Sequence, residues 1–364
     1  MQPVVGKVGE RATAAMSWGI LLLAMVSAGL PTLAYLALVW WLDRYEKEPA
    51  HLLAVTFLWG ALPAALLVAT LDLALDWPLR TLGEPVEAWR RAGLLTPVIE
   101  ELVKGAALVS VARWYRHEFN GVLDGIIYGA FVGLGFALTE NLLSFAAAFG
   151  NEGLQPGLVL VTLRAGLFGL NHPLFSALFG AGLGWVRYHG GRWTRPLVAG
   201  LGLAAAIGLH LLHNALAAGP AAGGWALALV ADWSGLALIA TLIALAWAHE
   251  RRWLVEGLGE EMHAGTLSRE EFAIAISHRR RAAAEWRAFR QSGWRGYRAL
   301  ARHYQALTDL AFARFHLRWQ DGAAPDQATL NRLRARTRRG RLALAASRLS
   351  AAATAPGTRQ PPEG

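Results

Sequence analysis

Long apolar stretches of about twenty residues recur along this chain, and they restrict its fold more than any other feature. Seven are predicted, at residues 18–42, 52–75, 94–112, 122–149, 158–188, 196–218 and 225–248. A helix needs about 20 apolar residues to cross the hydrocarbon core of a bilayer. The sequence therefore predicts an all-α protein, a polytopic membrane helix bundle of about seven spans.

Composition favours the same fold class. Of the 364 residues, 54% are hydrophobic and 17% are charged, whereas soluble domains carry about 25% charged residues. The absence of cysteine excludes disulfides and thiolate chemistry. The formal charge is +9, yet 21 of the 35 Lys and Arg and 11 of the 26 Asp and Glu lie from residue 250 onward, which leaves 14 and 15 before it. The positive excess is therefore confined to the C-terminal part, and without a nucleic-acid-binding motif no nucleic-acid partner is expected.

Basic residues in the short loops predict the orientation of the bundle. Five arginines follow the third and fifth stretches: Arg113, Arg116, Arg187, Arg192 and Arg195. The loops at 151–156 and 219–224 contain no Lys or Arg. This pattern predicts a multi-pass membrane protein with a cytoplasmic C-terminus. Five basic residues nearer the N-terminus disagree with it: Lys7, Arg11, Arg80, Arg90 and Arg91.

Three charged residues interrupt the third stretch within about one helical turn. Glu100 and Glu101 lie four and three residues before Lys104, so the ammonium group can reach either carboxylate on one helix face. Ionisable groups inside a membrane span are costly and by default indicate a functional site. The structural alternative is a buried ion pair, or a solvated stretch of a soluble helix, without chemistry.

Further polar residues lie inside three later stretches. They are Glu140 and Asn141, with Phe136 one turn before them, then His172, and then His210 and Asn214. At ~1.5 Å per residue, Glu100 lies ~9 Å from the non-cytoplasmic end of its stretch, Glu140 and His210 ~12 Å from theirs, and His172 ~21 Å from its own. Three of these four groups therefore converge in the non-cytoplasmic half of the bundle.

Each of these residues has a structural alternative. A lone histidine or asparagine in a span is often a hydrogen-bonded contact between helices, which applies to His172, Asn141 and Asn214. Arg164 is expected to snorkel or to pair with a carboxylate rather than to catalyse, and His213 is less securely directed at the site. Glu140 is harder to explain in this way, because a carboxylate in hydrocarbon must be paired, protonated or hydrated. The glycines at 129–135 and 180–184 are expected to allow close helix packing rather than to bind phosphate.

Clustered carboxylates and imidazoles in a hydrated membrane cavity favour hydrolysis. A carboxylate can take a proton from water, and an imidazole or an amide such as that of Asn214 can stabilise the oxyanion. The same residues could instead hold a divalent metal such as Zn²⁺, with Glu101, Glu140, His172 and His210 as ligands. The sequence contains neither HExxH nor GxGD. A proton-coupled membrane transporter is the alternative function, although it predicts inverted repeats that this sequence does not display.

Four motifs occur in order, each within a stretch. They are Glu100-Glu101-x-x-Lys104, Phe136-x-x-x-Glu140-Asn141, His172 and His210-x-x-x-Asn214. This series, together with the segments 43–49 and 123–129, resembles the PrsW-type intramembrane proteases, which are distantly related to the CAAX-processing and bacteriocin-immunity proteases. The resemblance covers residues 18–250. It implies cleavage of membrane-protein substrates, in that family an anti-sigma factor cut on its extracytoplasmic side.

The resemblance also implies roles for the motif residues. Glu100 and Glu101 would supply the catalytic base or a metal ligand. Glu140, His172 and His210 would complete the catalytic site, while Lys104, Phe136, Asn141 and Asn214 would support it. The expected substrate is a single-pass membrane protein.

A soluble, basic region follows the predicted protease core of residues 1–250. Ser268 and Glu271 form a capping box at the start of a helix, and a break is predicted at Ser292–Gly293. A second helix is expected to reach about Trp319, and a third carries the arginines from 332 to 341. We predict a basic helical cytoplasmic extension at 251–353 and a disordered tail at 354–364. The extension is expected to bind an anionic lipid surface, with a partner-binding module as the alternative.

Overall fold

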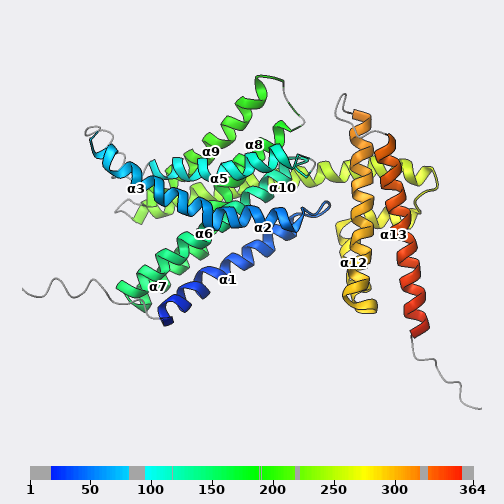
Figure 1. Cartoon of the computed structure of the whole chain (residues 1–364), viewed down its shortest axis with the longest axis horizontal. Coiled ribbons are helices and arrows are strands. Elements are labelled where there is room, and N and C mark those ends of the chain that lie inside the picture. Colours follow the sequence, from blue (N-terminus) through cyan, green and yellow to red (C-terminus); the bar gives the residue numbers. More distant parts are fainter. Residues whose placement is uncertain are drawn as a thin grey trace, which may run out of the picture. The chain divides into compact units, whose positions relative to one another are not determined.

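The computed structural model describes residues 18–81, 95–116, 118–187, 189, 191–217, 222–319 and 327–354. Over these residues the chain is helical and contains no β-strand, as predicted (Figure 1). It divides into two compact units. The first comprises the chain up to Asp43 and Glu48–Ile243, and the second comprises Arg44–Lys47 and the chain from Ala244 onward.

Six helices among the described residues are long and apolar enough to cross a membrane. They are Trp18–Leu42, Ala50–Leu75, Val122–Asn151, Leu154–Val186, Thr194–Ala217 and Gly223–His263. The remaining predicted span corresponds to α5 (Leu95–Trp114), which is not among the six. Its three central charges, on Glu100, Glu101 and Lys104, lower its apolar character. The polytopic helix bundle is therefore confirmed. Six helices of the described residues meet these criteria, and the number of about seven spans stays a prediction.

Two of the spans contain π-helical turns. In the second, η1 (Gly60–Ala64) joins α2 (Ala50–Trp59) to α3 (Ala65–Thr81) and contains Pro63. A wider turn accommodates proline, which cannot donate the usual backbone hydrogen bond.

The fourth span is interrupted, although the sequence predicts one continuous helix at 158–188. It consists of α7 (Leu154–Val161), η2 (Thr162–Leu167) and α8 (Asn171–Val186), separated from η2 by residues 168–170. Pro173 lies in the first turn of α8, where a missing N–H is tolerated. The hydroxyl of Tyr35 on α1 (Trp18–Leu42) donates to the Ala165 carbonyl at 2.8 Å, which satisfies a backbone group beside the break.

The most buried span of the first unit is α6 (Val122–Asn151). It packs against α1, α2, η1, α7 and α8. A Cβ atom added at Gly129 would overlap the Ser176 carbonyl on α8, and one added at Gly133 would overlap the His172 carbonyl. Small residues at a spacing of four let two helix backbones touch. These glycines therefore have the predicted packing role, and they set the position of His172.

The second unit consists of helices from the C-terminal part of the chain. They are the end of α10 (Ala222–His263), α11 (Arg269–Ala275), α12 (His278–Trp319) and α13 (Gln327–Thr354). Ser268 and Glu271 form the predicted capping box. The predicted break is confirmed as well, because α12 has a kink at Gly293 with φ 59°, a value that favours glycine.

Residues Arg44–Lys47 belong to the second unit, although they lie between α1 and α2 in the sequence. Tyr45 is part of its apolar core, together with Leu254, Leu258 and Leu307. The Tyr45 carbonyl accepts a hydrogen bond from Arg281 Nη1 at 3.2 Å. The unit therefore includes a segment that the sequence analysis placed outside the extension.

The basic charge of α13 is partly neutralised inside the second unit. Arg334 pairs with Glu261 at 2.9 Å, Arg336 with Asp309 at 2.6 Å and Arg341 with Glu271 at 3.0 Å. Residues 355–364 of the predicted disordered tail lie outside the described part of the chain, as do Lys7, Arg11, Arg90 and Arg91.

Candidate active site

Glu100, Glu101 and Lys104 are all buried on α5. Lys104 Nζ lies 2.5 Å from Glu101 Oε1 and 3.8 Å from Glu100 Oε2. The single ammonium group thus contacts both carboxylates, as the helical spacing predicts. Because Glu101 receives the shorter contact, Glu100 keeps the less compensated negative charge of the two.

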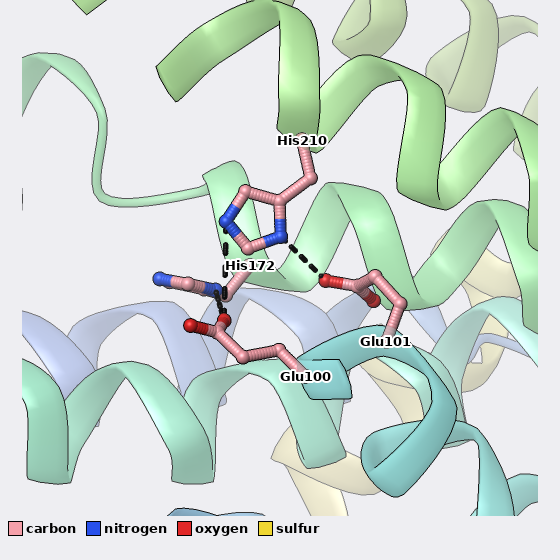
Figure 2. A group of neighbouring side chains, drawn as sticks. All are labelled: Glu100, Glu101, His172 and His210. Atoms are coloured by element: carbon pink, nitrogen blue, oxygen red, sulfur yellow. Dashed lines mark hydrogen bonds and ion pairs between the residues drawn. The ribbon is translucent and has the colours of Figure 1, made fainter. Parts of the chain in front are cut away.

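His210 approaches the two carboxylates from α9 (Thr194–Ala217). Its Nδ1 atom lies 2.9 Å from Glu101 Oε1, and its Nε2 atom lies 3.9 Å from Glu100 Oε2. Figure 2 shows the imidazole between the two side chains. The ring of Phe175 stacks on it with a centroid distance of 4.6 Å, which restricts its rotation.

His172 reaches the same carboxylate from the first turn of α8. Its Nδ1 atom lies 3.9 Å from Glu100 Oε2 and 3.3 Å from Lys104 Nζ. Its Nε2 atom lies 2.6 Å from Glu140 Oε2 on α6. The break before α8 therefore brings His172 to the level of the α5 carboxylates (Figure 2).

The two imidazoles follow one pattern. In each ring one nitrogen faces a carboxylate, Glu101 for His210 and Glu140 for His172. A carboxylate accepts, so that nitrogen carries the proton and the other is the acceptor. The acceptor nitrogens are His210 Nε2 and His172 Nδ1. Both lie 3.9 Å from Glu100 Oε2, and His172 Nδ1 also lies 3.3 Å from Lys104 Nζ.

Two further predicted residues hold Glu140 and Lys104 in place. Arg164 Nη2 lies 2.6 Å from Glu140 Oε1, and Arg164 Nε donates to Asn141 Oδ1 at 3.0 Å. The predicted pairing of Arg164 with a carboxylate is thus present. Lys104 Nζ lies 4.7 Å from the centroid of the Phe136 ring, a cation–π contact that stabilises a buried ammonium group.

These side chains border a cavity of about 410 Å³. Its polar lining includes Glu100, Glu140, His172, His210 and Asn214. Leu160, Phe168 and Trp225 line its apolar side. The structure thus brings the five predicted catalytic residues into one cluster, with Glu101 behind His210 and Asn214 on the cavity wall. Such a cavity has both the polar groups and the apolar surface needed to hold a segment of membrane protein.

A family model described as PrsW family intramembrane metalloprotease matches residues 48–248, more than half of the chain. The chain belongs to the PrsW family. Protease PrsW of Geobacillus kaustophilus is 32% identical over 167 residues, which are 45% of this chain and 68% of that protein. Protease PrsW of Bacillus subtilis is 28% identical over 45% of this chain and 70% of its own length. Protease PrsW of Oceanobacillus iheyensis is 31% identical over 46% of this chain and 72% of its own length. No solved structure matches the chain.

Membership of the PrsW family decides between the two functions that the sequence left open. The chain is an integral, multi-pass membrane protein and a hydrolase of peptide bonds whose substrates are membrane proteins. The predicted intramembrane protease is therefore confirmed, and the transporter alternative has no support.

Because the PrsW family is one of metalloproteases, the cluster has to be compared with a metal site. Glu100, Glu101, His172 and His210 each offer a donor atom within 4.8 Å of the others. Glu100 Oε2 is buried and has no hydrogen-bond partner among the described residues. A carboxylate and two imidazole nitrogens are typical donors for Zn²⁺ and other first-row metals. The residues fit a divalent ion.

The donor group differs from the predicted ligand set at one position. The prediction includes Glu140, whereas the group that the structure brings together contains Glu100 instead. Glu140 contacts the outer nitrogen of His172 and so lies behind the ring. Three carboxylates, of Glu100, Glu101 and Glu140, face two cationic side chains, of Lys104 and Arg164. One negative charge remains, which a bound cation or a proton would compensate.

The sequence analysis assigned no role to Asn171 and Asp232, two residues beside this PrsW-family site. Asp232 on α10 is buried and accepts hydrogen bonds from His213 and Asn171. The available signal was that Asp232 is the one charged residue in the apolar stretch at 225–248. A lone acid in such a stretch indicates a functional site as much as Glu140 does.

Proposed function

We propose that this chain is an endopeptidase that cuts single-pass, membrane-anchored proteins of the anti-sigma-factor kind within this cavity. The observation that carries the proposal is the position of Glu100. Its Oε2 atom is buried, has no hydrogen-bond partner in the described part of the chain, and lies 3.9 Å from the acceptor nitrogens of both His172 and His210. A water molecule at this position would meet one carboxylate and two imidazoles.

The roles of the side chains follow from their contacts. Glu100 takes the proton from the attacking water. Glu101 and Glu140 fix the tautomers of His210 and His172, so that their acceptor nitrogens face the reaction. Lys104 compensates the charge of Glu101 and anchors it. The amide of Asn214, on the cavity wall, donates to the oxyanion that forms on the substrate.

A divalent ion such as Zn²⁺ is the alternative activator of the water. It would be held by Glu100, His172 and His210, and Glu100 would then be a ligand instead of the base. When bound, such an ion supplies Lewis-acid activation of the water. Glu101 and Glu140 would then be the partners of the metal-binding imidazoles, a role in which carboxylates raise the basicity of the ring.

The C-terminus is proposed to be cytoplasmic, with the cavity in the non-cytoplasmic half of a bacterial plasma membrane. A contact of Arg187 supports placing the two basic loops on the same side of the membrane. Its guanidinium donates to the carbonyls of Phe119 at 3.1 Å and Arg116 at 2.8 Å. Positively charged loops remain in the cytoplasm. Glu100 lies 13 residues from Arg113. His172 lies 15 residues from Arg187, and His210 lies 15 residues from Arg195. On a helix these spacings correspond to ~20–22 Å.

The second unit is proposed to lie on an anionic lipid surface. Arg334 and Arg336 have acidic partners, so the arginines that would meet lipid are the exposed Arg332, Arg338 and Arg339. A cluster of arginines near a membrane attracts anionic headgroups at ~1 kcal/mol each.

Co-expression with candidate single-pass proteins tests the proposed function. The wild-type chain and Glu100→Gln are compared for fragments of each candidate, with membrane insertion verified for both. We expect a fragment with the wild type alone. A fragment that persists with Glu100→Gln would refute the assignment of Glu100.

A further inference from the structure

A second acid–imidazole pair, Asp232 and His213, lies beside the site and has no role in the reaction proposed above. Asp232 is 1% exposed. Its Oδ2 atom lies 2.7 Å from His213 Nδ1 and 3.1 Å from Asn171 Nδ2. Its Oδ1 atom is buried, and no described residue forms a hydrogen bond with it. Asp232 therefore holds His213 firmly, and α10 is connected through it to α8 and α9.

His213 belongs to the cavity but not to the cluster around Glu100. It lines the cavity, and its side chain is 16% exposed. The Phe175 ring lies 4.6 Å from His210 and 6.3 Å from His213. It contacts both imidazoles of α9, which are three residues apart. His213 is thus displaced along the cavity from the point where water is activated.

The bond to Asp232 determines which nitrogen of His213 is available. Nδ1 carries a proton toward the carboxylate, so Nε2 is the atom that can exchange a proton with a bound molecule. The amide nitrogen of Asn171 lies 3.4 Å from Nε2 and 3.1 Å from Nδ1. The negative charge of Asp232 compensates the positive charge of the ring when both nitrogens are protonated.

Hydrolysis of a peptide bond needs a proton donor as well as a proton acceptor. An amine cannot leave as an anion, so the departing nitrogen must gain a proton as the C–N bond breaks. Enzymes commonly separate the two tasks between groups in different surroundings. Glu100, with its unpaired buried oxygen, is suited to accept a proton, whereas His213, backed by Asp232, is suited to donate one.

We propose that His213 is the general acid of this protease and that Asp232 is its positioning residue, an inference that rests on the proposed function of the site. Water oxygen bonds to the carbonyl carbon, and the water proton goes to Glu100. The C–N bond then breaks with its electron pair on nitrogen, and that nitrogen takes the proton from His213 Nε2. Glu100 returns its proton to His213 through water, which restores both groups and leaves an acid and an amine.

The test compares two leaving groups in the full-length chain reconstituted in liposomes. The probe is a synthetic single-span peptide with the sequence cleaved in the co-expression experiment, prepared with either an amide or an ester at the cleaved bond. An alcohol leaves without the strong acid assistance that an amine requires. For His213→Gln we expect kcat for the amide to fall about 10²–10⁴-fold with KM unchanged, and kcat for the ester to fall less than about tenfold. Asp232→Asn is expected to show the same selectivity with a smaller loss.

Ser234→Ala is the matched control, because Ser234 is exposed on α10 and its hydroxyl donates to the Val230 carbonyl of the same helix. Ester hydrolysis reports folding of the His213 and Asp232 variants. An equal loss of amide and ester cleavage in both variants, a change confined to KM, or unchanged amide cleavage overturns the proposal. Glu100→Gln separates the two hypotheses: if it still cleaves both probes, the proposed function fails irrespective of His213.

Discussion

Glu140 Oε2 lies 2.6 Å from His172 Nε2, on the side of the ring opposite the nitrogen that faces Glu100. Glu101 stands in the same relation to His210, at 2.9 Å from Nδ1. Each imidazole of the cluster therefore has its own carboxylate on its outer nitrogen. In the proposed mechanism these two acids orient the rings, and Glu100 is the acid that takes part in the reaction.

Removing an outer acid should slow cleavage without abolishing it. Glu140→Ala deprives His172 of its acceptor, so both tautomers become populated, and we expect cleavage to fall about 10–100-fold. Initial rates of fragment formation in liposomes give the measurement. Glu152→Ala, an exposed acid at the end of α6, is the control. Cleavage at the control rate would show that Glu140 does not orient His172.

Removal of metal provides a second test. If Glu100, His172 and His210 hold a divalent ion, a strong chelator should abolish cleavage and added Zn²⁺ should restore it. Elemental analysis should find about one ion per wild-type chain and a reduced amount in His172→Ala. Full activity without bound metal would leave Glu100 as the sole activator of water.

The backbone contact between α6 and α8 predicts the effect of one added methyl group. A Cβ at Gly133 would overlap the His172 carbonyl. Gly133→Ala should therefore destabilise the bundle by about 1–3 kcal/mol, the usual cost of overpacking, and displace His172. Thermal unfolding in detergent and cleavage are the two readouts. Gly29→Ala is the control, since nothing lies within 4 Å of a Cβ at Gly29; equal behaviour of the two variants would contradict the predicted contact.

The sequence was sufficient to find the motif residues, because acids and imidazoles are rare in apolar stretches and each one is conspicuous. It could not give the correct depth of His172. A distance of ~21 Å assumed a continuous helix, whereas the chain is interrupted at residues 168–170. When residues are counted from the basic loop instead, His172 and His210 are each 15 residues away, from Arg187 and Arg195 respectively. Local patterns do not reveal such a break, since it depends on Tyr35 of another helix bonding to Ala165.

Other features depended on partners that are distant in sequence. Which nitrogen of His172 would face Glu140 could not be read from spacing. The acidic partners of Arg334 and Arg336 lie 73 and 27 residues away, so the helix looked uniformly basic. The capping box at Ser268 and the kink at Gly293 were predictable, because both are determined by residues within one turn.

Acid should loosen the second unit through Glu271. A hydrogen bond from His303, followed by the bond to the Ser268 amide and the charge of Arg341, lowers the pKa of Glu271 from 4.5 to about 2. A depressed carboxyl pKa stabilises the folded state fully above about pH 4.5, and this stability is lost as the pH falls toward about 2. Hydrogen exchange of the full chain should show faster exchange in α11 and α13 over that range. In Glu271→Gln this dependence on pH should be smaller; an identical profile would exclude Glu271 as its source.

Lipid binding by the second unit should depend on a subset of its arginines. Replacing the exposed Arg332, Arg338 and Arg339 by Ala should reduce binding of the detergent-solubilised chain to vesicles rich in anionic lipid, and less so at high salt. Replacing the paired Arg336 should have less effect on binding and more on stability. If both variants bind like the wild type, a protein partner becomes the better explanation for the basic charge.

Arg281 bonds to the carbonyl of Tyr45, 236 positions earlier in the chain. During synthesis, the loop that contains Tyr45 emerges long before its partners are made. Its partners Leu254 and Arg281 are available only after α10 and α12 have been translated. A chain truncated after α10 would lack Arg281 and Leu307 and would leave this aromatic side chain less covered, which favours degradation.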